Sequence, residues 1–148
     1  MQQIDVKDTV LIVVGVDLNA EEKDRPIAYY LKSQIDQHAR AAGKPYRQGL
    51  VITDALWLRD KIIQICPTVA IGGPGVNALA AQLVDKLPVA YGEENRFFIQ
   101  MEDQVLNNKI SIWGMNQATT KMGVDTFLSS GLLDKYLEVV WPSGPSGK

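Results

Sequence analysis

A glycine-rich turn between a short apolar run and a helical pattern constrains the fold of this chain most. Residues 68–71 are TVAI, residues 72–75 are GGPG, and alanine and leucine recur at helical spacing over residues 78–83. This order predicts a strand, a tight loop and a helix. Glycine permits positive φ and close approach of a ligand to the backbone, and a helix N-terminus carries unpaired N–H groups at the positive end of its dipole. The loop is therefore a candidate site for an anion.

The first third of the chain predicts a buried strand followed by a helix. Residues 9–16 are almost continuously aliphatic, which is typical of a strand buried on both faces of a parallel sheet, and we expect it to be central. Residues 17–23 are polar and predict a loop. Asp24 then lies where a helix N-cap belongs, ahead of Pro26 in the first turn. The apolar stripe of this helix recurs every four residues, at Ile27, Leu31, Ile35 and Ala39.

The remaining elements follow from the same patterns. Residues 48–53 and 89–91 predict strands, and residues 55–66 predict a helix that Pro67 stops. Residues 96–101 and 109–114 also predict strands, and the segment between them is too short for a crossover helix. We therefore expect these two to form an antiparallel pair at one edge of the sheet. The last helices are expected over residues 117–128 and 132–140.

These patterns together predict a single α/β domain over residues 1–141. The expected fold has three layers, with a mostly parallel sheet, helices on both faces and an antiparallel strand pair at one edge. A length of 148 residues with 46% hydrophobic side chains fits one domain with a full core. The tail over residues 142–148 lacks apolar side chains and is expected to be disordered.

Composition argues against several classes of protein. A formal charge of −2 and no run of lysine and arginine argue against a nucleic-acid partner. The single cysteine, Cys66, excludes an internal disulfide and fits a reducing compartment. Histidine, cysteine and glutamate show no metal-ligand spacing, so no metal is expected, and nothing indicates a cofactor. With no apolar run long enough to cross a bilayer, we expect no membrane partner and a cytoplasmic location.

Candidate binding residues follow the strands, because ligands of parallel α/β folds lie beyond the carboxyl ends of the strands. The polar and glycine residues expected at those ends are Asp17, Asp54, Gly72, Gly73, Gly75, Asn77 and Asn116. Aspartate and asparagine also cap helices, and each of the two asparagines is placed to cap the helix that follows it. Capping and ligand binding therefore compete as explanations of these residues.

Known catalytic and nucleotide-binding signatures do not match the chain. The dinucleotide fingerprint requires its glycines after the first strand, where only Gly15 occurs. The phosphate loop of ATPases requires lysine and serine or threonine after the last glycine, where Val76 and Asn77 occur. His38 is expected to be solvated and Cys66 to lie in the core, so no catalytic residue is identified.

Residues 71–79, together with residues 51–54 and 112–115, resemble a group of small uncharacterised bacterial α/β proteins. The Gly-Gly-Pro-x-x-Asn element over residues 72–77 is also similar to a segment of archaeal surface-layer protein domains, where it lies at a strand-to-helix turn. The resemblance implies such a turn here. It implies no reaction and no catalytic residue.

Three functions agree with these observations. The favoured one is binding of a small anion, nucleotide or sugar phosphate at the glycine-rich loop. The second is a hydrolase or glycosyl-transfer enzyme that uses Asp17 or Asp54. The third is a non-catalytic scaffold that assembles with itself. A homodimer is expected because the last helix carries more apolar surface than a terminal helix usually needs, at Leu133, Tyr136, Leu137, Val140 and Trp141.

Overall fold

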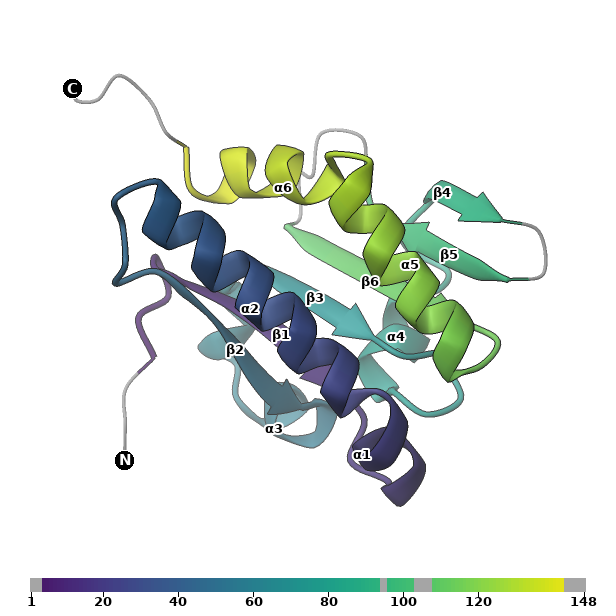
Figure 1. The fold of residues 1–148 in the computed structure, drawn as a ribbon. Coiled ribbons are helices and arrows are strands. Elements are labelled where there is room, and N and C mark those ends of the chain that lie inside the picture. Colours follow the sequence, from purple (N-terminus) through teal and green to yellow (C-terminus); the bar gives the residue numbers. More distant parts are fainter. Residues whose placement is uncertain (1–3, 94–95, 103–107, 143–148) are drawn as a thin grey trace.

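A six-stranded sheet forms the centre of the computed structural model, which describes residues 4–93, 96–102 and 108–142 (Figure 1). The strand order is β2-β1-β3-β6-β5-β4. The strands are β1 Thr9–Val14, β2 Gln48–Thr53, β3 Thr68–Ile71, β4 Val89–Glu93, β5 Phe97–Gln100 and β6 Lys109–Gly114. The helices are α1 Leu18–Lys23, α2 Arg25–Ala41, α3 Asp54–Arg59, the 3-10 turn η1 Ile63–Ile65, α4 Ala78–Leu83, α5 Gln117–Ser129 and α6 Leu132–Val140.

The pairing of the strands makes the sheet mostly parallel. β1 pairs in parallel with β2 and β3, and β3 pairs in parallel with β6. β5 runs antiparallel to both β6 and β4, so the predicted antiparallel pair is confirmed. β6 itself lies inside the sheet, and β4 forms the outer edge beyond the pair. The mixed α/β class expected from the sequence is therefore observed.

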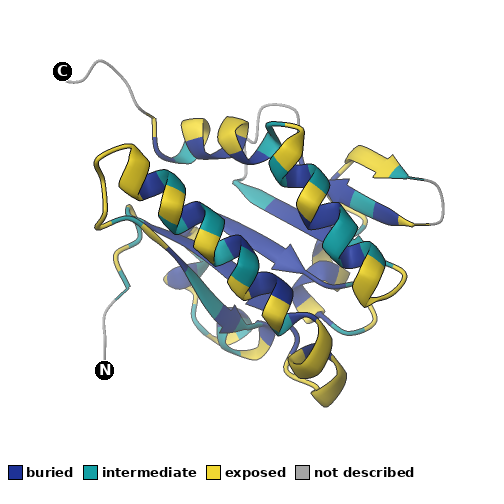
Figure 2. Ribbon diagram, in the orientation of Figure 1, coloured by how far each residue is buried: buried dark blue, intermediate teal, exposed yellow. Residues whose placement is uncertain are grey.

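β1 lies inside the sheet and is completely buried, as its aliphatic run predicts (Figure 2). Its alternate residues belong to two separate hydrophobic clusters. Val10, Ile12 and Val14 pack with side chains of α2, α5 and α6, whereas Leu11 and Val13 pack with side chains of α3, η1 and α4. Alternation of side chains across a strand makes this division possible.

α2 has the apolar stripe expected from its sequence, and all four stripe residues are buried. In Figure 2 its opposite face is largely exposed. The side chains of Lys32 and Asp36 also bond the backbone of the edge strand β2, at the carbonyl and the N–H of Gly49. Bonds of this kind occupy groups that an unpaired strand edge would otherwise offer to another chain.

Two local expectations are wrong. Residues 18–23 form α1 rather than a loop, because Asp17 Oδ1 accepts a hydrogen bond from the N–H of Ala20 at 2.8 Å and Ala20 is buried. The helix expected over residues 55–66 ends at Arg59. Asp60 Oδ1 accepts from the N–H of Ile62 and starts a new turn, which leads into η1. In both segments the structure differs from the expectation because an aspartate side chain accepts hydrogen bonds from nearby backbone N–H groups.

The apolar face of α6 packs against the hydrophobic core of the same chain. Leu133, Tyr136 and Leu137 lie in the same hydrophobic cluster as β1 and α2. The hydroxyl of Tyr136 donates to the carbonyl of Asn108 at 2.8 Å, and Trp141 Nε1 donates to the carbonyl of Lys7 at 3.0 Å. The residues that motivated a homodimer therefore have partners in the chain's own core.

The tail expected to be disordered lies outside the described residues from position 143 onward. In the described part of the chain, none of the helices is both long and apolar enough to cross a bilayer.

Candidate functional site

A pocket of about 340 Å³ lies beyond the carboxyl ends of β3 and β6, and we call it the strand-end pocket. Its walls come from the α1–α2 junction, the glycine-rich loop and the start of α5. The lining residues are Asn19, Lys23, Asp24, Gly73, Pro74, Gly75, Val76, Trp113, Gly114, Met115, Asn116, Gln117 and Thr120. Its position and size are those expected of a ligand site in a parallel α/β fold.

The glycine-rich loop is closed by its own backbone. Gly72 has φ of 108°, which favours glycine, and its N–H donates to the carbonyl of Ile112 in β6 at 3.0 Å. The carbonyl of Gly73 accepts from the N–H groups of Val76 and Asn77. Any Cβ at position 72 would lie 2.5 Å from Oδ2 of Asp24. The loop therefore needs glycine at position 72 both for its conformation and for the approach of Asp24.

Asn77 joins two strands to a helix through four hydrogen bonds. Its Nδ2 donates to the carbonyls of Val13 and Ile71 at 2.9 and 3.0 Å, and its Oδ1 accepts from the N–H groups of Leu79 and Ala80. The residue is only 1% exposed. An asparagine side chain offers two donors and two lone pairs, so its hydrogen-bonding capacity is used. Its predicted capping role is confirmed, and its side chain is not available to a ligand.

The N-terminus of α4 offers no free donors to an anion. The N–H of Asn77 donates to the Gly73 carbonyl, that of Ala78 donates to Oδ2 of Asp54 at 2.7 Å, and those of Leu79 and Ala80 donate to the Asn77 side chain. These are the four amides that a helix leaves without internal partners. An anion would have to displace bonds that already exist.

The other predicted residues divide between capping and lining. Asp54 is buried, bonds α4 as described and lies outside the pocket wall. Asp17 is exposed and caps α1, also outside the wall. Asn116 lines the pocket and caps α5, with Oδ1 accepting from the N–H of Thr119. The wall therefore contains Gly73, Gly75 and Asn116 from the predicted set.

Asp24 is the acidic residue of this pocket, and the sequence pattern did not assign it to the site. It was expected to cap α2, but its backbone is already helical, and its side chain makes no capping bond. α1 ends directly before α2. The N–H of Asp24 therefore donates to the carbonyl of Ala20 in α1, and the carbonyl of Asp24 accepts from the N–H of Ala28 in α2. The carboxyl is thereby released from capping and lines the strand-end pocket.

The Asp24 carboxyl is buried and without a partner. The residue is 7% exposed, and among the described residues no hydrogen bond or ion pair reaches its side chain. Burial and, to a smaller extent, the charge of Asp17 raise the pKa of this carboxyl from 3.8 to about 6, against a smaller lowering by Lys23. Its oxygens are not among the fully enclosed polar atoms, so the carboxyl faces the pocket without a donor from the described residues.

A larger hollow of about 700 Å³ lies at the opposite, amino ends of the strands. Its main polar groups already have partners. Arg47 approaches Oδ1 of Asp8 at 3.4 Å and lies over the Trp141 ring at 5.5 Å, and Trp141 Nε1 bonds the Lys7 carbonyl. The strand-end pocket is therefore the better candidate site.

Removing either capping asparagine should destabilise the fold, but to different extents. Asn77→Ala would leave two buried carbonyls and two amides of α4 without partners, so we expect a loss of roughly 2 to 4 kcal/mol in the free energy of unfolding. Asn116→Ala removes an exposed cap and should lose about 1 kcal/mol. Urea denaturation of both variants measures the difference. Equal losses would contradict the assigned role of Asn77.

The pKa of Asp24 predicts a pH-dependent stability. Below about pH 4 the carboxyl is protonated in both the folded and the unfolded chain, whereas between pH 4 and 6 only the folded chain keeps the proton. The wild type should therefore lose stability as pH rises through this range. Asp24→Asn removes the loss, and should be more stable than the wild type by up to about 3 kcal/mol at pH 7 and similar at pH 4.

Asp85→Asn is the matched control, because Asp85 is exposed. Urea denaturation from pH 4 to 7 should give this control the same profile as the wild type. A pH-independent difference between Asp24→Asn and the wild type would contradict the prediction.

Comparison with known proteins adds no residue to this site. No family model matches the chain, and no curated protein matches it. The resemblance of residues 71–79 to small bacterial α/β proteins therefore stays a prediction. The case for the strand-end pocket depends on its geometry.

Proposed function

We propose that this protein binds a small polar molecule in the strand-end pocket, against the glycine-rich loop. The observation that carries the proposal is the Asp24 carboxyl, which is buried, lines the pocket and accepts no hydrogen bond from the described residues. A buried carboxylate is costly unless a donor is bound to it. A ligand hydroxyl, amino or ammonium group would supply that donor.

The charges and hydrogen bonds around the strand-end pocket favour a ligand that carries hydrogen-bond donors. A simple anion would meet the negative charge of Asp24, which Lys23 in the same wall offsets only in part, and the amides of α4 that were expected to hold it are occupied. A nucleoside or sugar part, by contrast, carries hydroxyl or amino donors that suit a carboxylate. Nucleotides and sugar phosphates therefore remain within the proposal through their donor-bearing part rather than through a phosphate at the glycine-rich loop.

The two other functions have less support. An enzyme that uses Asp17 or Asp54 would need a carboxylate that faces a substrate pocket, and both carboxylates bond backbone amides outside the wall of the strand-end pocket. A scaffold without a ligand would leave the buried Asp24 carboxyl without a role. We further infer a three-layer arrangement with helices on both faces, supported by the two hydrophobic clusters that share β1. A cytoplasmic location is proposed on the buried, unpaired thiol of Cys66.

A thermal-shift screen tests the proposed function. The panel contains nucleosides, hexoses, polyols, amino acids and primary amines, together with nucleotides, sugar phosphates and inorganic phosphate at millimolar concentration. We expect at least one donor-bearing compound to raise the melting temperature with concentration, because binding to the native state stabilises it. Inorganic phosphate alone should have no effect.

Two variants locate the binding. Asp24→Ala removes the acceptor and should abolish the shift, whereas Asp85→Ala changes an exposed aspartate and should keep it. A shift that survives in Asp24→Ala would place the ligand elsewhere. If no compound stabilises the wild type, the proposed function is wrong.

A homodimer also remains a prediction, although the residues of α6 that motivated it pack against the chain's own core. The exposed side chains of Val89 and Tyr91 on the edge strand β4 are its remaining motive. Light scattering at high micromolar concentration should give the mass of a dimer if the prediction is correct. The mass of a monomer would remove it.

A further inference from the structure

The start of α5 presents backbone donors to the strand-end pocket. The N–H groups of Gln117 and Ala118 have no acceptor among the described residues, since the Asn116 cap bonds Thr119 and the Asn116 carbonyl bonds Thr120. Gln117 lines the pocket. α5 spans 13 residues, so its N-terminal end carries a substantial part of the helix dipole. This wall therefore favours an acceptor, above all a carboxylate.

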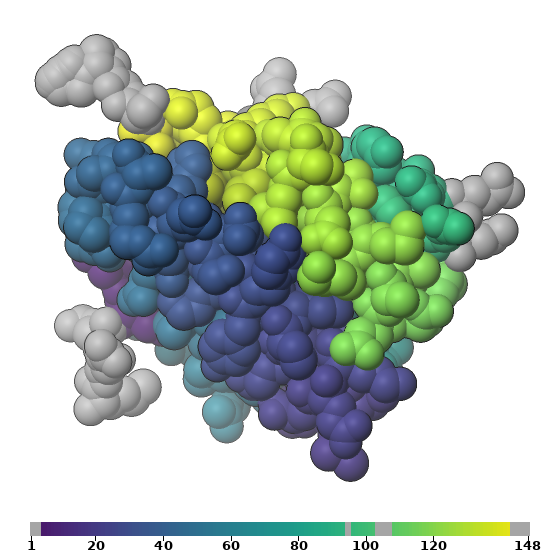
Figure 3. All heavy atoms as spheres, viewed as in Figure 1, coloured from purple at the N-terminus to yellow at the C-terminus, as the bar shows by residue number. Residues whose placement is uncertain are grey.

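The same pocket presents an acceptor at Asp24. As described above, this carboxyl is more than nine-tenths buried and has no donor among the described residues. It belongs to the start of α2, and Figure 3 shows α2 and α5 lying side by side. The strand-end pocket is thus lined by a carboxyl without a donor, by the cation Lys23 and by Gln117, whose N–H has no acceptor among the described residues.

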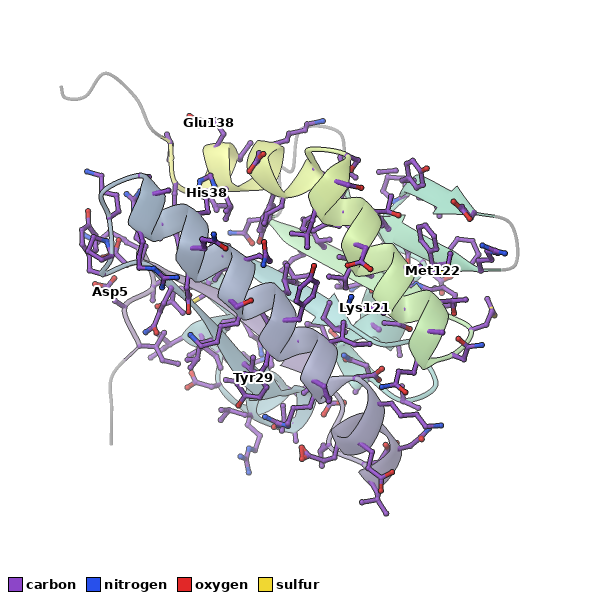
Figure 4. All side chains as sticks on the ribbon, in the orientation of Figure 1. Asp5, Tyr29, His38, Lys121, Met122 and Glu138 are labelled. Atoms are coloured by element: carbon purple, nitrogen blue, oxygen red, sulfur yellow. The ribbon has the colours of Figure 1, made fainter. Side chains whose placement is uncertain are left out.

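A second hollow lies beside the strand-end pocket, between these two helices. A hollow of about 370 Å³ is lined by Pro26 and Ile27 of α2 and by Gln117, Ala118 and Lys121 of α5, and it shares Gln117 with the strand-end pocket. Lys121 reaches from α5 towards α2 (Figure 4), where its Nζ lies 4.3 Å from the centroid of the Tyr30 ring. The walls of this second hollow are mainly apolar and suit the side chain of a ligand bound next to it.

We propose that the ligand is a zwitterion with an ammonium and a carboxylate group, of the α-amino acid class. The ammonium binds the Asp24 carboxylate, and the carboxylate binds the N–H groups of Gln117 and Ala118. The inference rests on the proposed function and narrows its ligand class. A simple anion satisfies the amides and Lys23 but leaves Asp24 without a donor, and a simple cation satisfies Asp24 but leaves the amides without an acceptor.

The twenty standard α-amino acids are the first probes, measured by thermal shift and then by calorimetric titration. The best binder is next compared with two derivatives of itself. Its N-acetyl form lacks the ammonium, and its carboxamide form lacks the carboxylate. We expect each derivative to bind at least tenfold more weakly, because each loses one charge-assisted contact.

Two variants test which part of the protein binds the ammonium and which binds the carboxylate of the ligand. Asp24→Asn should weaken the amino acid at least tenfold and change the affinity of the N-acetyl form little. Gln117→Pro removes one N–H at the first position of α5, where proline is tolerated, and the preceding Asn116 is extended with ψ of −177°, as proline requires. It should weaken the amino acid but not the carboxamide. Asp85→Asn serves as the control and should bind as the wild type does.

The outcomes separate the two proposals. Neutral compounds that bind through Asp24 while no amino acid binds would overturn the zwitterion and leave the proposed function intact. A carboxamide that binds as tightly as its parent would also overturn it. If nothing stabilises the wild type, both proposals fail. The derivatives test the inference on the wild-type protein, so the result does not depend on the folding of Gln117→Pro.

Discussion

The side chain of Asn77 is the interaction on which the rest of this structure depends. Its Nδ2 donates to the carbonyls of Val13 and Ile71, near the carboxyl ends of two parallel strands, and its Oδ1 accepts from the first amides of α4. The contact brings the loop so close to β1 that a Cβ at Gly15 would overlap the carbonyl of Val76. Because all four bonds are buried, water cannot replace them, and the carboxyl end of the sheet has one arrangement.

This bonding explains why the candidate site does not lie where the glycine-rich loop first indicated. Asn77 and Asp54 use the donors of α4 for folding, so the positive end of that helix is neutralised within the chain. Unmatched polar groups remain on the other wall, at Asp24 and at the start of α5. A side chain whose hydrogen bonds are all made within the chain has a structural role, whereas a polar group that faces a pocket without a partner is a functional candidate.

Local pattern was sufficient to predict most elements of the fold. The aliphatic run of β1, the stripe of α2 and the capping asparagines each depend on near neighbours in the sequence, and each was found as expected. Asp24 could not be predicted in the same way. An aspartate before a proline indicates an N-cap, and that rule holds only where the preceding residues are not helical. Here α1 supplies a helical neighbour, stabilised by the cap at Asp17.

The position of Asp24 also links ligand binding to stability. Its carboxyl is close to Gly72 because that residue has no Cβ, and the burial that results raises its pKa to about 6. At neutral pH the chain therefore keeps a charge that opposes folding. A group that opposes folding when empty and is neutralised when a donor binds couples the two processes, because the ligand then relieves a cost present in the free protein. A pocket made only of satisfied caps would have no such coupling.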